Sequence, residues 1–277
     1  AGIGITQQEL EHGRNDYRKV MTPYLEGTQP MKTRMTPRLP DFLGLGTQKG
    51  GTTSLHHSLN SRRQVFLPAC KEIHYFDINY EKSEEWYSRN FQNAKEGQVC
   101  GEITPMYMFH PKAPERIHRL LPKVKMIVLL RDPAERAIAQ ICHAIQRDFE
   151  NLDPSAAIEA EDARLETGDT YSLQKHSYIS RSKYLEQLDR YECLFDKNQL
   201  LVLKSEDLFT DQSQSWKKLN SFLGLEEEGP IGKFPKKNQR QKKELGITAE
   251  LRETIRRKLM DTAEGVRERY GFGWDWA

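Results

Sequence analysis

The chain has 277 residues, enough for one large α/β domain with a full hydrophobic core. Its formal net charge is only +2, which argues against a nucleic-acid binder that neutralises many phosphates, although a local basic cluster can still hold one small anion. The apolar stretch "VKMIVLL" near the middle of the chain is far too short to cross a bilayer.

The N-terminal region and the cysteines indicate the expected cellular location, metal content and domain bounds of the chain. The N-terminus lacks the basic-then-apolar pattern of a signal peptide, so we expect a soluble, cytoplasmic protein without a membrane partner. Four cysteines without CxxC spacing favour buried thiols over a zinc site, and no metal is expected. Residues 1–40 read as an N-terminal extension or linker, and the compact domain is expected over 41–277. Because the first residue is Ala1, the chain can also be part of a longer polypeptide.

Short apolar runs alternate with helical patterns from Phe42 onward. The alternation indicates a parallel sheet covered by helices on both faces. The predicted fold class is therefore α/β, a P-loop-like parallel sheet whose ligands bind beyond the carboxyl ends of the strands. Strands are predicted at 42–45, 64–68, 98–103, 125–130 and 199–204, and helices at 53–61, 84–91, 114–121, after 131 and at 250–271.

The stretch "FLGLGTQKGGTTSLHHSL" predicts a loop that holds an anion, usually a phosphate. It is an apolar run followed by a Gly-rich turn and a helix, which aims unpaired backbone N–H groups at one point. Lys49 precedes the glycines, so this is not the GxxxxGK[ST] loop of nucleoside triphosphatases. A plain strand-to-helix turn is the alternative. The candidate ligands are Lys49, Gly50, Gly51, Thr52, Thr53 and Ser54.

Further candidates follow the other predicted strands. In "LPACKEIHYFD", Glu72 and His74 are two residues apart in an extended segment and point the same way, as a proton-accepting pair would; a surface Glu and a His within an aromatic cluster are the alternative. In "GEITPMYM", Tyr107 is a candidate wall of the cleft, and core packing explains it equally well. Arg131 ends a strand, where a guanidinium can bind phosphate or pair with a carboxylate.

These segments together resemble the sulfotransferases that use 3′-phosphoadenosine 5′-phosphosulfate (PAPS) and release adenosine 3′,5′-bisphosphate (PAP). The matching stretches are "TQKGGTTS", "KEIHYFD", "GEITPMY", "LLRDPAERAIAQ" and the closing "GFGWDW". The resemblance implies that Lys49 contacts the sulfate-bearing phosphate and that the residues after it wrap this group. It also implies that Glu72, with His74 alongside, activates the acceptor hydroxyl and that Arg131 binds the 3′-phosphate.

The sequence departs from that family at two positions. Ala139 stands where many members have a serine that helps bind the 3′-phosphate, so we expect help from a basic residue of the run "KKNQRQKK". Ile103 stands where heparan-type enzymes have a catalytic lysine. With the low net charge, this favours an acceptor less charged than a long polyanionic glycan.

The chain also resembles sulfotransferase domains of polyketide and olefin synthase assembly lines. That resemblance implies a β-hydroxyacyl group on an acyl carrier protein as the acceptor, with a phosphopantetheine arm. His143 and Arg147, about one helical turn apart, are candidate acceptor contacts or ordinary helix-face residues. A glycan or small-metabolite acceptor and a non-catalytic nucleotide-binding module are the alternatives. The sequence does not fit a P-loop kinase, because it lacks the lysine and the magnesium ligands of such a kinase at the expected spacing.

Overall fold

The structure is a computed structural model that describes residues 38–210, 212–226 and 245–276. The predicted N-terminal extension lies almost entirely outside the described residues, and the division of the chain near residue 40 therefore stays a prediction. The basic run at 236–243, the expected helper at the 3′-phosphate, also lies outside them. No helix of the described part is long and apolar enough to span a membrane.

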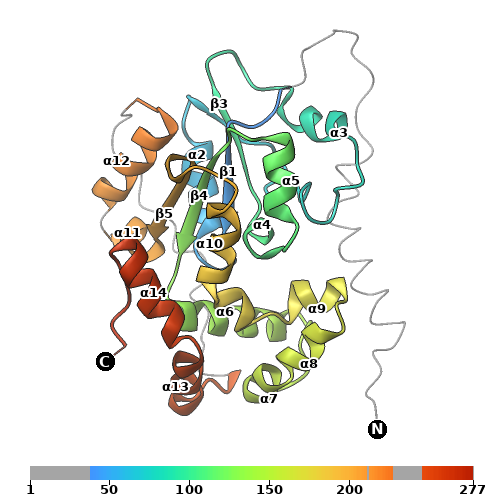
Figure 1. Ribbon diagram of the computed structural model, residues 1–277, viewed down its shortest axis with the longest axis vertical. Helices are drawn as coiled ribbons and strands as arrows, with labels where there is room; N and C mark the ends of the chain where they lie inside the picture. Colours follow the sequence, from blue (N-terminus) through green and yellow to red (C-terminus); the bar gives the residue numbers. More distant parts are fainter. Residues whose placement is uncertain (1–37, 211, 227–244, 277) are drawn as a thin grey trace. The chain divides into compact units, whose positions relative to one another are not determined.

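Five parallel strands form one sheet in the order β2-β3-β1-β4-β5 within the described residues (Figure 1). The predicted α/β class and parallel sheet are confirmed. They could be predicted because the buried strands of a parallel sheet read in the sequence as nearly continuous apolar runs. All strands end at the same edge, so the loops after them meet there. The strands are β1 Phe42–Gly46, β2 Val65–Phe66, β3 Val99–Ile103, β4 Lys125–Leu130 and β5 Leu200–Lys204.

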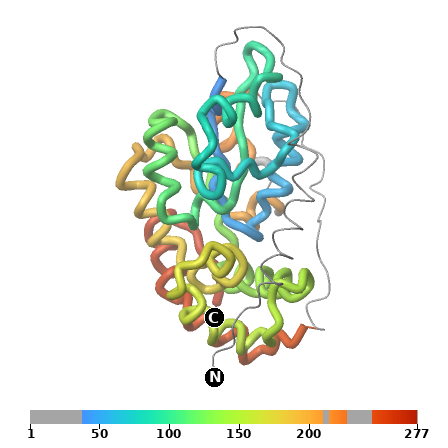
Figure 2. Tube along the Cα trace, turned by 90° about the vertical axis from the view of Figure 1, so that its right-hand side faces the viewer, coloured from blue at the N-terminus to red at the C-terminus, as the bar shows by residue number. Residues whose placement is uncertain are grey.

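The two faces of the sheet carry separate hydrophobic clusters, because successive side chains of a strand point to opposite faces. In β4, Met126 and Val128 join one cluster, and Ile127 and Leu129 join the other. Helices α5 and α10 cover the first face, and α2 and α12 cover the second (Figure 1). A third cluster joins α6, α7 and α13 beyond the carboxyl ends of the strands. Figure 2 shows the segment of α6–α9 gathered at that end.

The helices alternate with the strands largely as the sequence predicts. Asp132 caps α6 and Pro133 is its first residue, two residue types that are favoured at these positions of a helix start. The helices are α2 Thr52–Asn60, α3 Glu84–Ser88, α4 Met106–Phe109, α5 Ala113–Leu120, α6 Pro133–Gln146, α7 Pro154–Glu159, α8 Glu161–Glu166, α9 Thr170–Lys175, α10 Tyr184–Glu192, α11 Ser205–Thr210, α12 Gln212–Leu223, α13 Ala249–Lys258 and α14 Met260–Tyr270.

Three local expectations need correction. The single C-terminal helix is two helices, α13 and α14, which meet at Leu259; the predicted stop at Gly271 holds, with φ 72°. The predicted helices leave out residues 106–109, which form the short helix α4. Among the cysteines, Cys100 and Cys142 are buried but Cys193 is exposed.

Candidate active site

The loop between β1 and α2 is fixed by hydrogen bonds to its neighbours. Thr47 donates to the Leu129 carbonyl twice, from its backbone N at 2.9 Å and from Oγ1 at 3.0 Å. Gly50 N donates to the Thr47 carbonyl at 2.8 Å, and Ser205 Oγ donates to the Gly50 carbonyl at 2.5 Å. The loop is therefore held in a defined shape by β4 and by the start of α11.

Both glycines of the loop are required by their surroundings. A Cβ on Gly50 would lie 2.4 Å from Thr47 Oγ1 and 2.9 Å from the Leu129 carbonyl oxygen. Gly51 has φ 96° and a Cβ there would lie 2.7 Å from the Phe209 ring. Gly51 is also the N-cap of α2, where no side chain caps the helix, so the amides of Thr52 and Thr53 in the first turn remain suited to an anion.

Arg131 meets this loop directly. Its Nη1 donates to the Lys49 carbonyl at 3.1 Å, because β1 and β4 are neighbours in the sheet. Arg131 therefore lies directly beside the loop, at the end of the neighbouring strand. No carboxylate of the described residues pairs with the Arg131 guanidinium, which was the alternative role considered for it.

The Lys49 side chain is partly buried, and its backbone has φ 65°. Burial lowers the pKa of its ammonium to about 8; the Glu72 carboxylate opposes this shift, and the charges of Arg147 and Lys71 add to it. Near neutral pH the ammonium is still mostly protonated. It can therefore stabilise the negative charge of an anion held by the loop.

Glu72 and His74 do lie together, in a chain of charged groups. His74 Nδ1 contacts Asp77 Oδ2 at 2.7 Å and its Nε2 lies 3.5 Å from Glu72 Oε2, while Lys71 Nζ donates to Glu72 Oε1 at 2.7 Å. Burial alone would lower the pKa of His74, but hydrogen bonds to Asp77 and Glu72 raise it to about 9. Burial alone would raise the pKa of Glu72, but His74 and Lys71 lower it to about 2.

These protonation states distinguish the two candidate bases. At neutral pH the His74 imidazole is already protonated and cannot accept a proton, whereas the Glu72 carboxylate is ionised. Of the two groups, the Glu72 carboxylate is therefore the one in a form that can accept a proton. His74 and Lys71 hold the carboxylate in place.

Further cations act on Lys49 and Glu72, and they come from the ends of helices far along the chain. Burial, together with the charges of Lys49, Arg147 and Lys175, lowers the pKa of His143 to about 4, so this imidazole is neutral. Burial, with the charges of Arg181 and Arg147, also lowers the pKa of Lys175. The predicted residues His143 and Arg147, at the end of α6, thus lie in the electrostatic field of Lys49.

Sequence reasoning missed several residues of this region. Arg181 is buried, donates to Gln48 Oε1 at 2.6 Å and to the Leu173 carbonyl at 2.8 Å, and so joins α9 to the loop. Lys175 lies on α9, with its ammonium 4.1 Å from the centre of the Phe149 ring. No motif marks these residues, because each reaches the site through contacts that are distant in sequence.

Two positions singled out in the sequence lie in the core. Tyr107 is fully buried; its hydroxyl accepts from Tyr75 N at 2.8 Å and donates to Glu102 at 3.0 Å, so Tyr107 is not a wall of the cleft. Ile103 is also fully buried, packed against Gly44. A lysine would not fit there without rearrangement.

Comparison with known proteins assigns the family. A family model described as "Sulfotransferase domain" matches residues 39–273. The chain belongs to this family. The matched range covers all five strands and every segment of the site described above.

Individual relatives have low to moderate sequence identity to this sulfotransferase domain. Human heparan sulfate glucosamine 3-O-sulfotransferase 6 is 31% identical over 188 residues, 68% of this chain and 53% of that protein. The chain spans about half or less of the curated relatives it matches. The crystal structure of a sulfotransferase from Alicyclobacillus acidocaldarius has a TM-score of 0.72 and 22% identity, covering 86% of this chain and 98% of that one. The sulfotransferase domain of the Synechococcus PCC 7002 olefin synthase has a TM-score of 0.53 and 16% identity, covering 90% and 100%.

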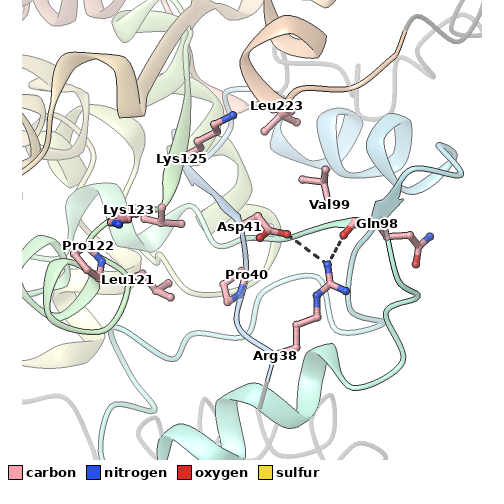
Figure 3. A pocket seen from close by; sticks show the side chains of 12 residues that line it. Arg38, Pro40, Asp41, Gln98, Val99, Leu121, Pro122, Lys123, Lys125 and Leu223 are labelled. Carbon is pink, nitrogen blue, oxygen red and sulfur yellow. Dashed lines mark hydrogen bonds and ion pairs between the residues drawn. The ribbon is translucent and has the colours of Figure 1, made fainter. Parts of the chain in front are cut away.

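A hollow of about 670 Å³ opens at the other edge of the sheet, at the amino ends of the strands (Figure 3). Arg38 crosses it and contacts Asp41 and the Gln98 carbonyl. Lys123 and Lys125 also line it. Because Lys49 and Arg131 follow the carboxyl ends of β1 and β4, this hollow is not part of the candidate active site.

Proposed function

We propose that the chain transfers the sulfuryl group of PAPS to a hydroxyl of a glycan or small metabolite that carries a negative charge. The observation that supports this most directly is the 3.1 Å hydrogen bond from Arg131 to the Lys49 carbonyl. It brings a guanidinium and an anion-binding loop side by side. A nucleotide with phosphates at its 3′ and 5′ positions has one anionic group for each.

Residues of this site supply the proton acceptor and the charge-stabilising groups that the proposed reaction requires of the protein. The acceptor oxygen attacks sulfur in line, and its proton passes to a Glu72 carboxylate oxygen. The new O–S bond forms as the bond from sulfur to the bridging oxygen breaks, and PAP leaves with the electron pair. Lys49 and the first-turn amides of α2 stabilise the charge that develops on that oxygen, and preorganised donors of this kind contribute a few kcal/mol each.

The cations that act on Lys49 and Glu72 support the choice of acceptor. Lys71, Arg147 and Lys175 are more positive charges than one carboxylate balances, and an anionic group beside the acceptor hydroxyl would complement them. The low net charge of the whole chain pointed to a less charged acceptor, but the charge is concentrated locally. The likeness to an assembly-line domain concerns the fold alone, so a carrier-bound acyl hydroxyl has no support beyond it.

Calorimetric titration with PAP tests the donor site. We expect the wild type to bind PAP at micromolar or lower concentration and Lys49→Ala and Arg131→Ala to lose at least tenfold in affinity, since each removes a charge-assisted contact to phosphate. Lys123→Ala, at the opposite edge of the sheet, is the control and should bind as the wild type does. No binding to the wild type would contradict the proposed function.

Glu72→Gln tests catalysis separately from binding. The variant should bind PAP as the wild type does but lose sulfate transfer by about 10²–10⁴-fold, the usual contribution of a positioned proton acceptor. Transfer from PAPS would be followed with carboxylated, sulfated and neutral oligosaccharides and with a β-hydroxyacyl carrier protein. Unchanged transfer by Glu72→Gln would show that Glu72 is not the proton acceptor of the reaction. Preference for the carrier-bound or neutral acceptors would contradict the anionic acceptor.

A further inference from the structure

The last described residues of the chain return to the place where Arg131 leaves β4. Trp276 Nε1 donates to Asp132 Oδ2 at 2.7 Å, and Trp274 Nε1 donates to Glu206 Oε2 at 3.2 Å. The two carboxylates belong to the starts of α6 and α11, which follow the adjacent strands β4 and β5. Both tryptophans of the closing "GFGWDW" thus contact the rim of the proposed donor site.

The same carboxylates fix the backbone that follows Arg131. Asp132 Oδ1 accepts from Glu135 N at 2.9 Å as the N-cap of α6, and Asp132 N donates to Glu206 Oε1 at 2.9 Å. The Tyr184 hydroxyl donates to the Arg131 carbonyl at 2.8 Å. The elbow between β4 and α6 is therefore held at several atoms around the arginine.

The C-terminal segment is itself well anchored. Trp274 is buried, and its carbonyl accepts from Arg267 Nη2 at 3.0 Å. Its ring packs against Phe272 at 6.1 Å and Tyr184 at 6.4 Å between centroids. A segment held by its own core contacts can position another group without a ligand being present.

The contacts of Asp132 also decide what Arg131 can bind. A carboxylate next to an arginine in the chain is an obvious rival for its guanidinium. Here one oxygen of Asp132 caps α6 and the other accepts from the indole of Trp276. In the described part of the chain, the guanidinium of Arg131 contacts the neutral Lys49 carbonyl and no carboxylate, so its charge stays available to an anion.

We infer that Trp276 is a positioning residue of the donor site: its indole N–H holds the Asp132 carboxylate and so keeps Arg131 directed at the 3′-phosphate. The inference rests on the proposed function, since it assumes that PAP is the ligand. It adds the C-terminal segment to the donor site, beyond the loop and strand exit that the sequence predicts.

The test compares two nucleotides on the Trp276→Phe variant, which keeps an aromatic ring but loses the N–H donor. PAP carries both phosphates, whereas adenosine 5′-monophosphate lacks the one that Arg131 would bind. By calorimetry we expect roughly a three- to tenfold loss in affinity for PAP and less than about a twofold change for adenosine 5′-monophosphate, as for one charge-assisted hydrogen bond acting through its neighbour. Trp86→Phe, a partly buried tryptophan on α3, is the control for loss of an indole.

Three results would decide the matter. A selective loss of PAP affinity supports the positioning role. If Trp276→Phe does not fold, Trp274→Phe replaces it in the test and should show the same selective loss. Equal losses for both nucleotides, or no loss for PAP, would overturn it, because a purely structural role has no reason to distinguish them. Failure of the wild type to bind PAP would instead overturn the proposed function.

Discussion

At the residue scale, the protonation of Lys49 links its burial to its proposed task. A buried ammonium surrounded by other cations gives up its proton more readily, and the pKa of about 8 reflects this. The neighbouring Glu72 carboxylate only partly offsets the effect. The protein therefore holds a lysine that is charged at neutral pH but not far above it.

Donor affinity should consequently fall as the pH rises. The lowered pKa means that the charged form of Lys49 dominates below about pH 8 and is lost above it, so PAP binding should weaken by up to tenfold per unit from about pH 8 upward. Calorimetry at constant ionic strength across this range measures the effect. Lys49→Arg, which stays charged throughout, should flatten the profile. A wild-type profile that stays flat to about pH 9.5 would show that Lys49 charge does not matter.

At the element scale, the loop between β1 and α2 shows why its glycines cannot be replaced. Gly51 combines a positive φ with contact to Phe209, whereas Gly97 has φ 80° with nothing within 4 Å of its Cβ position. The two glycines therefore share the backbone cost of a side chain and differ in the steric cost. They form a natural matched pair.

Gly51→Ala should destabilise the protein more than Gly97→Ala. A left-handed alanine costs about 1–2 kcal/mol at either position. The clash with the Phe209 ring should add roughly 1–3 kcal/mol at Gly51 only. Urea unfolding of both variants gives the two values, and PAP titration should show weaker binding for Gly51→Ala alone. Equal destabilisation would mean that the loop shifts without cost.

The elements themselves could largely be predicted from the sequence. The buried strands read as apolar runs, and "RDP" places the start of α6 correctly. The break at Leu259 could not be predicted, because neither glycine nor proline marks it. Within the candidate site, contiguous motifs led to Lys49, Glu72 and Arg131, whereas the bond between Arg181 and Gln48 spans 133 residues and has no local signature.

At the scale of the whole molecule, one buried carboxylate affects stability across the acid range. Glu102 on β3 is almost fully buried and accepts hydrogen bonds from Tyr87 at 2.6 Å, Thr104 at 2.8 Å and Tyr107 at 3.0 Å. Burial raises its pKa to about 7, although these hydroxyl donors act in the opposite direction. The folded protein therefore binds a proton there that the unfolded chain releases at lower pH.

The free energy of unfolding should accordingly fall as Glu102 ionises. With a folded pKa of about 7 and an unfolded value near 4.5, the folded state holds more protons between these values, so this group costs stability as the pH rises, by up to about 3 kcal/mol. Glu102→Gln should remove this slope. Urea unfolding of both proteins from pH 4.5 to about pH 7 measures the difference. Parallel profiles would show that Glu102 stays ionised in the fold.

The proposed donor groups and the cations proposed to contact the acceptor lie on different parts of the fold, and this affects how such a domain can evolve. The proposed donor groups, Lys49 and Arg131, follow strands whose side chains form the two main clusters of the core, so the backbone that leads to them is fixed by the fold. Arg147 and Lys175 lie at helix ends outside that sheet. Under the proposed function, natural variation or directed evolution can therefore change the acceptor preference at these two positions while the donor groups are kept.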